Sequence, residues 1–243
     1  TIFPMPPSLH RMQSSRACHG FTMVELVIVL AVVGLLAGLI IPSLVKARHQ
    51  AAATRCLDNC RALGEAFIQY SQDNNGRLVP FSQPRPSETD KDKSSELLWT
   101  ELLGTYADEH KLWHCPECRA GTHSGLAYNR LLANSGITMS QVLKPSQTVV
   151  FGDAGPVSNP KEKNPDLWRE MSGNILEESV RARFAVPGAP SWQPAKHSPV
   201  RMVNRHRGRA SAIFADGRAM RLPVSQVGFQ HEAGDARALW DNQ

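Results

Sequence analysis

One long apolar segment constrains this chain more than any other feature. Residues 21–41 form a run of 21 residues in which Glu25 is the only charged side chain. As a helix rising about 1.5 Å per residue, the run is roughly 30 Å long, which matches the hydrocarbon core of a bilayer. A carboxylate inside such a segment is costly, so its presence indicates a function that supplies it with a partner.

Two general explanations account for the length of this segment but not for Glu25. A secretory signal peptide has an apolar stretch of roughly 7–15 residues followed by a small-residue cleavage site. The run here is longer, and LIIPSLVKARHQ at its far end contains no convincing A-x-A site, although LLAGL is a weak candidate. A plain membrane anchor fits the length, yet it leaves the acid and its flanking residues without a role.

The residues around the acid resemble a known processing signal. The sequence GFTMVE at residues 20–25 is similar to the type III signal of type IV pilins and type II secretion pseudopilins, in which Gly and Phe precede a Glu and an apolar helix. The resemblance implies that a prepilin peptidase cleaves between Gly20 and Phe21 and methylates the new amino terminus of Phe21. Pro42 also matches a helix-bending proline that family members often carry near the end of the span.

The resemblance further implies a role for Glu25 in assembly. After cleavage, the amine of Phe21 is a cation at the membrane edge, and in a growing filament it pairs with Glu25 of an incoming subunit. In a medium of low dielectric constant such a pair is strong, whereas an unpaired carboxylate is heavily penalised. The alternative is an acid near a helix end whose side chain reaches out to the membrane surface.

Helical spacing continues beyond the membrane segment. Apolar residues recur between residues 43 and 72 with Ala-rich turns between them, and residues 73–76, DNNG, supply turn chemistry. Pro42 removes one helical hydrogen bond, so a gentle bend is expected there. We therefore predict an α+β fold of the pilin type, in which a long N-terminal helix, membrane-spanning in its first half, packs on a small antiparallel sheet.

This fold divides the chain into four parts. They are a leader peptide (1–20), a transmembrane helix (21–42), the periplasmic half of the long helix (43–72) and a globular domain (73–243). The periplasmic half also resembles a subgroup of pseudopilin-like proteins with the pattern C-x-x-N-x-x-x-L-G-x-A-x-x-x-Y, which is matched by Cys56, Asn59, Leu63, Gly64, Ala66 and Tyr70.

Four elements are predicted in the first part of the globular domain. We expect a polar loop over residues 81–95, a helix over residues 96–107 and a strand over residues 148–155. Residues 155–200 are rich in Pro, Ser and charge, and we expect a long excursion with one short helix at residues 174–184.

The C-terminal segment 206–222 predicts a β-hairpin. A strand over residues 210–215 leads into Asp216-Gly217, a strong signal for a two-residue type I′ turn, and residues 218–222 return antiparallel.

His206 and Asp216-Gly217 together form an H-x9-D-G element, which resembles one found at the C-terminus of many prepilin-type proteins. We interpret the element as structural. In the alternative, His206 and Asp216 bind a metal or a partner, but an extended strand holds them roughly 30 Å apart. No metal site is therefore predicted.

The cysteines of the exported part form two pairs, Cys56 and Cys60 on the helix and Cys115 and Cys118 in the segment HCPEC. Because an exported domain lies in an oxidising compartment, disulfides are favoured, with three possible connectivities. Cys56 and Cys60 lie one helical turn apart and face the same way, so we predict bridges from helix to loop, such as Cys56–Cys115. The alternatives are a four-thiolate zinc site with His114 as a spare ligand, free thiols, or a redox pair.

The resemblance implies a structural subunit and not an enzyme. It implies a single-pass protein of the bacterial inner membrane, with a periplasmic C-terminal domain, that is drawn into a short fibre of a type II secretion or pilus-like machine. The implied partners are a prepilin peptidase, other pseudopilin subunits and an inner-membrane assembly platform. The sequence contains no G-x-S-x-G, H-E-x-x-H, P-loop or G-x-G-x-x-G motif, and we predict no cofactor and no catalytic residue.

A membrane-anchored binding module is the competing interpretation. Residues 196–221 contain seven Lys or Arg and one acid, Asp216, and such a stretch suits an anionic glycan, a secreted cargo or DNA. A solvated hairpin face or a contact between subunits explains the same charges and is preferred. The formal net charge of +5 falls by two without Arg11 and Arg16 of the leader, so nucleic-acid binding is not predicted.

Overall fold

The computed structural model describes residues 21–85, 96–107, 114–118, 125–133, 136–171, 183–192 and 198–241. The chain divides into two compact units, Thr1–Lys46 and Ala47–Gln243. The long helix α1 (Met23–Asp73) begins in the first unit and ends in the second.

The first unit contains the apolar part of α1. Its most apolar stretch has a mean hydropathy of 2.9, and none of that stretch is buried within the protein. Length and composition therefore suit this part of the helix to a bilayer. The helix continues through Pro42, so the proline does not end it.

The centre of the second unit is a six-stranded sheet. Along its path lie β5 (Arg183–Phe184), β3 (Leu126–Asn129), β4 (Val149–Pro156), β7 (Ala210–Phe214) and β8 (Ala219–Leu222), and β6 (Val200–Met202) pairs with the end of β4. The β3–β5 pairing is parallel and the other pairings are antiparallel. The predicted α+β fold, a long helix on a small antiparallel sheet, is therefore confirmed, with one parallel pairing at the sheet edge. All eight residues of β4 are buried, and this strand confirms the one predicted at residues 148–155.

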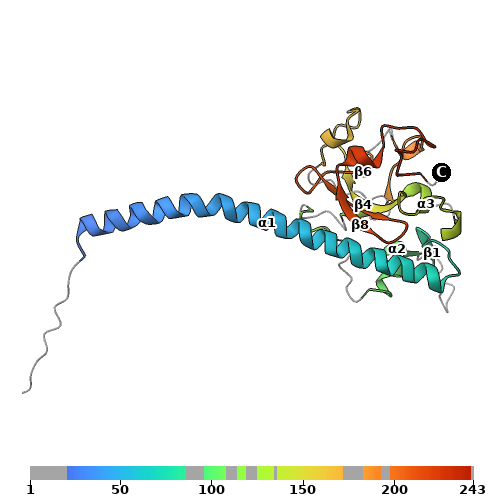
Figure 1. Cartoon of the computed structure of the whole chain (residues 1–243), viewed down its shortest axis with the longest axis horizontal. Coiled ribbons are helices and arrows are strands. Elements are labelled where there is room, and N and C mark those ends of the chain that lie inside the picture. The colour runs from blue at the N-terminus through green and yellow to red at the C-terminus, as the bar shows by residue number, and fades with distance from the viewer. Residues whose placement is uncertain are drawn as a thin grey trace, which may run out of the picture. The chain divides into compact units, whose positions relative to one another are not determined.

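The part of α1 in the second unit packs one face against this sheet. Its buried residues recur every three or four positions, which is the pattern of an amphipathic helix. They include Cys56, Cys60, Leu63, Phe67 and Tyr70. Figure 1 shows this part of α1 running beside β4 and β8. The helix ends at Asp73, and positive φ angles follow within the predicted DNNG turn.

Side chains of the strands point into two hydrophobic cores, one on each face of the sheet. In β7, Ile213 belongs to the core beneath α1, whereas Ala212 and Phe214 belong to the core on the opposite face. In β4, Phe151 belongs to the α1 side, where its ring packs edge-on against Phe67 with centroids 5.5 Å apart. The sheet therefore separates the helix from the C-terminal segments.

Shorter elements surround the sheet. They are the strand pair β1 (Ser82–Pro84) and β2 (Glu96–Leu98), the helices α2 (Trp99–Gly104) and α3 (Arg130–Ala133), and the 3-10 turns η2 (Met139–Gln141), η3 (Pro165–Leu167), η4 (Pro190–Trp192) and η5 (Val224–Val227).

Three sequence predictions need correction in these elements. The predicted helix at residues 96–107 begins as the strand β2, and the predicted loop at residues 81–95 contains the strand β1 that pairs with it. Of the short helix predicted at residues 174–184, the last two residues form β5, and the rest lies outside the described residues.

The predicted hairpin is present, but its turn is of another type. Strands β7 and β8 pair from Ala210 opposite Leu222 to Ile213 opposite Ala219, and Phe214 bonds to Arg218 beyond them. Three residues, 215–217, therefore form the loop. Gly217 has a φ of +85°, whereas Asp216 does not have a positive φ, so the type I′ prediction is wrong. A three-residue loop with a left-handed glycine at its end is the next commonest hairpin connection.

Candidate functional site

The processing motif lies at the start of α1. Gly20 lies outside the described residues, and Phe21 is exposed just before the helix. Glu25 is in the first turn, where its Oε2 accepts hydrogen bonds from the Thr22 backbone N–H at 2.9 Å and the Thr22 hydroxyl at 2.7 Å. The Glu25 N–H donates in return to Thr22 Oγ1 at 3.2 Å. This reciprocal pair is a capping box, so the acid also stabilises the end of its own helix.

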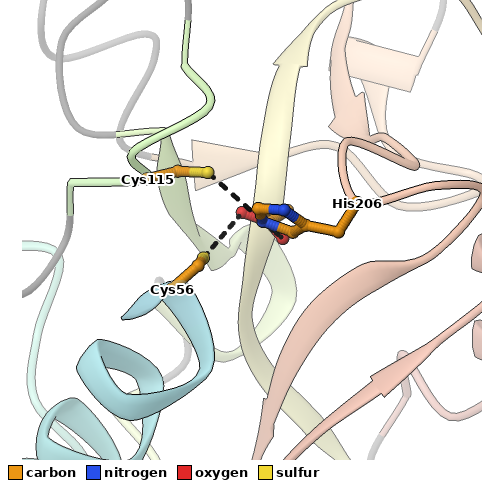
Figure 2. Close-up of side chains that lie close together, drawn as sticks. Cys56, Cys115 and His206 are labelled. Atoms are coloured by element: carbon orange, nitrogen blue, oxygen red, sulfur yellow. Dashed lines mark hydrogen bonds and ion pairs between the residues drawn. The ribbon is translucent and has the colours of Figure 1, made fainter. Parts of the chain in front are cut away.

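A second group of side chains, whose atoms can bind a metal or take part in reactions, lies inside the globular unit. Cys56, Cys115, Asp153 and His206 each offer one donor atom, and these four atoms lie within 4.8 Å of one another. All four residues are buried. Cys56 comes from α1, Cys115 from the HCPEC loop, Asp153 from β4 and His206 from the loop before β7. Figure 2 shows Cys56, Cys115 and His206 pointing toward one another from three separate segments.

The separations within this cluster are short. Cys115 Sγ lies 3.3 Å from His206 Nε2, and His206 Nε2 lies 3.4 Å from Asp153 Oδ2. The Cys56 thiol faces Asp153 Oδ1 at 3.6 Å. The four donor atoms therefore surround a common centre.

Asp153 is held in place by contacts outside the cluster. Its Oδ2 accepts the backbone N–H of Ser211 at 2.6 Å, and its Oδ1 lies 3.4 Å from the guanidinium of Arg205. Burial alone would raise the pKa of the Asp153 carboxyl. The contact with His206, the charge of Arg205 and the Ser211 N–H outweigh burial and hold the pKa below its usual value. Asp153 is therefore a buried carboxylate anion.

Two turn-forming residues place His206. Its backbone N–H bonds to the Arg209 carbonyl at 2.9 Å and the return bond measures 3.2 Å, while Arg207 and Gly208 take positive φ angles. The imidazole Nε2 thereby points into the cluster. Burial lowers the pKa of the His206 imidazole, but Asp153 and Cys115 reverse this and raise the pKa to about 10.

A second carboxylate faces the other nitrogen of the same ring. Glu117 Oε2 lies 3.0 Å from His206 Nδ1, close enough for an ion pair, although the ring N–H is not aligned for a hydrogen bond. The contact is therefore one between charges. The other Glu117 oxygen lies 2.7 Å from His49 Nδ1 on α1, so this carboxylate connects the HCPEC loop to the helix.

The two thiols are protonated in the absence of a bound cation. The Cys56 sulfur, burial and the Asp153 charge raise the pKa of the Cys115 thiol, against a lowering by His206. Contact with Cys115 lowers the pKa of the Cys56 thiol, but Cys60, burial and Asp153 together raise it. A thiolate here needs a positive charge at the centre of the cluster.

Arg205 closes one side of the cluster. Its guanidinium binds both oxygens of Glu170, at 2.9 and 2.6 Å, and also donates to the carbonyls of Gly125 and Ala154. Solvent reaches the outer side of these residues through a cavity of about 870 Å³. Its lining includes Arg48, His49, Glu117, Glu170, Arg205 and Arg207.

The predicted cysteines and His114 do not all lie at one site. Cys56 and Cys115, the suggested bridge between helix and loop, lie together, and no disulfide joins the described cysteines, which are Cys56, Cys60, Cys115 and Cys118. All four cysteines contribute to the core beneath α1, but the group of donor atoms contains only the sulfurs of Cys56 and Cys115. The alternative four-thiolate arrangement is therefore not present among the described residues. His114, the proposed spare ligand, is exposed.

The residues of the H-x9-D-G element also lie at separate places. His206 enters the buried cluster, whereas Asp216 is exposed and accepts the N–H of Arg218 at 3.0 Å. Gly217 contacts the helix: a Cβ added to Gly64 would lie 2.2 Å from the Gly217 carbonyl oxygen. Asp216-Gly217 therefore lies in the hairpin loop, as predicted, although the turn is not of type I′.

Sequence reasoning missed Asp153 and Glu117. Asp153 is an acid inside a predicted buried strand, FGDAG, which is an unusual place for a carboxylate and is the signal that was available. Glu117 is the acid of the HCPEC segment and gives no signal of its own. Neither residue is placed beside His206 by spacing along the chain, because the fold brings them together.

Comparison with known proteins bears on the N-terminal motif. Residues 15–41 match the family model described as the prokaryotic N-terminal methylation motif. The N-terminal segment carries a prepilin-type methylation motif. The match covers the processing signal and the apolar run and stops before the globular unit. No curated protein and no solved structure matches the chain.

Proposed function

We propose that this chain is a pseudopilin or pilin-like structural subunit, matured by a prepilin peptidase that cleaves after Gly20 and methylates Phe21. The match of residues 15–41 to the methylation motif carries this proposal. The α+β layout, with a long N-terminal helix packed on a sheet, agrees with it. In this role the protein is a substrate of the peptidase and performs no catalysis itself.

The apolar part of α1 serves two purposes in this proposal. It holds the precursor in the inner membrane with the globular unit in the periplasm, and it later packs among the helices of other subunits in a filament. The exposed apolar side chains between residues 21 and 45 suit both environments, because each removes them from water. The filament belongs to a type II secretion or type IV pilus-like machine and is assembled on an inner-membrane platform.

Glu25 gives the assembly its register. In an apolar helix bundle the carboxylate needs a cation, and the methylated amine of Phe21 on a neighbouring subunit supplies one. Breaking a buried ion pair by removal of one partner costs about 3–5 kcal/mol, which corresponds to a loss of association of more than about 100-fold.

A set of substitutions tests this assignment. The Glu25→Gln variant keeps an oxygen for the capping box with Thr22 but loses the charge. We expect Glu25→Gln and Glu25→Ala to be inserted and processed normally and to yield no filaments. Thr22→Ala is the matched control, because it removes the capping partner and retains the carboxylate. Filament yield is measured by shearing and immunoblotting, and normal filaments from Glu25→Gln would contradict the role of the charge.

The alternative of a basic binding module receives less support. Arg201 is buried, with its guanidinium stacked over the rings of Trp168 and Trp192, and Arg205 is bound to Glu170. These two cations of the 196–221 stretch are therefore engaged by groups within the fold, which leaves fewer of the seven for an external anionic ligand.

A further inference from the structure

We propose that Cys56, Cys115, Asp153 and His206 form a structural binding site for a single zinc ion. The proposal does not depend on the membrane or filament role of the chain. It rests on the arrangement of the four donors, on the residues that hold them, and on what a disulfide would leave unexplained.

The spacing of the donors is close to that of a tetrahedral site. Zinc binds thiolate sulfur at about 2.3 Å and imidazole nitrogen or carboxylate oxygen at about 2.0–2.2 Å, so neighbouring ligand atoms around it are separated by roughly 3.3–3.8 Å. Three contacts fall in this range: 3.3 Å from Cys115 Sγ to His206 Nε2, 3.4 Å from His206 Nε2 to Asp153 Oδ2, and 3.6 Å from Cys56 Sγ to the other Asp153 oxygen, Oδ1. One donor atom from each of the four residues lies within 4.8 Å of the other three, so shifts of about 1 Å would bring all four to tetrahedral spacing.

The donor types also suit zinc. Two sulfurs, one imidazole nitrogen and one carboxylate oxygen form a mixed set that a borderline-soft tetrahedral cation accepts, whereas calcium and magnesium require oxygen ligands. Because the protein supplies four ligands and buries all of them, no coordination position is left for a substrate. The site is therefore structural.

The surroundings supply charged partners for the ligands. A metal-bound histidine usually donates its second N–H to a carboxylate. Glu117 Oε2 lies 3.0 Å from His206 Nδ1, so a rotation of the imidazole ring would align this hydrogen bond. The ligating carboxylate is held in turn, since Asp153 Oδ2 accepts the Ser211 N–H at 2.6 Å. With two thiolates and one carboxylate, the zinc centre carries a net charge of about −1, which the Arg205 guanidinium faces from 3.4 Å.

The alternative is the disulfide between Cys56 and Cys115 that the sequence favoured. The closeness of the two sulfurs permits either outcome. A disulfide, however, needs neither an imidazole nor a carboxylate, and it would give no reason for the paired Asp153 and His206 to be buried against the two sulfurs. The convergence of all four donors is explained by a metal ion.

Zinc at this position would join four segments that are distant in the sequence. Cys56 belongs to α1, Cys115 to the HCPEC loop, Asp153 to β4 and His206 to the loop before β7. The ion would therefore fix the second part of the long helix to the sheet, and its removal would lower the stability of the globular unit.

The test is the metal content of the full chain, purified in detergent from membranes of cells that export it. We expect inductively coupled plasma mass spectrometry to find about one zinc ion per chain. Cys56→Ser and His206→Gln should each lose the ion. Cys60→Ser is the matched control, because Cys60 lies one turn along the same helix and is also buried, and it contacts Cys56 without being one of the four donors. Replacement of zinc by cobalt should give thiolate-to-metal charge-transfer absorption in the control and not in the two variants.

Two further measurements keep the test decisive if a variant fails to fold. Chelation of the unmodified chain should lower its Tm by several degrees, and added zinc should restore it. Glu117→Gln, which changes a positioning residue, should weaken zinc affinity by about 10–100-fold in competition with a chelating dye. A Cys56–Cys115 disulfide in a parallel sample alkylated at lysis, the absence of zinc, or unchanged zinc in Cys56→Ser and His206→Gln would each overturn the proposal.

Discussion

Glu25 illustrates how one residue can satisfy a local and an intermolecular requirement. Within the chain its Oε2 closes a capping box with Thr22, and this geometry follows from the T-x-x-E spacing at the helix start. A cap by itself needs an acceptor but no charge, since glutamine also serves at this position. The negative charge in an apolar run therefore requires the second, intermolecular explanation.

Asp166 provides a residue-scale prediction about pH. Its carboxylate accepts bonds from the Ser225 N–H at 2.9 Å, the Ser225 hydroxyl at 2.6 Å and Asn204 Nδ2 at 2.9 Å, and so it joins η3 to η5. Burial alone would raise the pKa of Asp166, but these bonds lower it overall. Because the folded-state pKa is below the unfolded-state value, the stabilisation is complete above about pH 4 and fades as the pH falls further.

We therefore expect Asp166→Asn to reduce the free energy of unfolding by about 1 kcal/mol at pH 7, after allowance for partial solvent exposure. The difference from the unmodified chain should shrink when urea unfolding is repeated near pH 3. Asp58→Asn is the control, because Asp58 is exposed beside Arg61 and should change stability by less than about 0.5 kcal/mol. A difference that grows at low pH would contradict the assignment.

At the scale of elements, the contact between α1 and the hairpin connects two sequence motifs. Gly64 lies in the helix pattern and Gly217 in the H-x9-D-G element, and each presents its backbone to the other. A Cβ added to Gly64 would lie 2.2 Å from the Gly217 carbonyl oxygen, which is backbone and has no room to withdraw. The two glycines set how closely the helix approaches the sheet.

Gly64→Ala should destabilise the globular unit by about 1–3 kcal/mol through this clash. The sign of this stability change is informative. In a helix with space for a methyl group, alanine is about 1 kcal/mol more favourable than glycine, so the substitution would otherwise stabilise the protein. Gln69→Ala on the exposed face of the same helix is the control and should be close to neutral. Stabilisation by Gly64→Ala in thermal unfolding would show that the helix does not lie this close to the turn.

The elements also show what could be predicted from the sequence. The helix, the strand at β4 and the hairpin follow from periodicity and turn residues, which are local properties. The type of the hairpin turn was missed because Gly217 alone takes a positive φ and the helix contact occupies the loop. The pairing of β1 with β2 was missed because it joins segments that propensity assigns to a loop and a helix.

The buried cluster could be predicted only in part for the same reason. The meeting of Cys56 with the HCPEC loop was expected from cysteine spacing, but the approach of Asp153 and His206 depends on the pairing of β4 with β7. That pairing is a long-range property that no local pattern contains. The sequence analysis therefore compared His206 with Asp216, its neighbour in the motif, and not with its neighbour in space.

On the scale of the whole molecule, the chain consists of an apolar helical part suited to a bilayer and a globular unit with its own two cores. Cleavage after Gly20 would remove the basic leader and create the amine that Glu25 requires. The proposed function thus depends on one covalent event at a defined bond.

The most direct measurement is the N-terminal mass spectrum of the mature protein, extracted from membranes of cells that contain a prepilin peptidase. The account predicts a first residue of N-methylated Phe21, with residues 1–20 absent, and an unprocessed chain in cells that lack the peptidase. A mature chain that begins at any other residue, or a Phe21 terminus that forms without the peptidase, would contradict it.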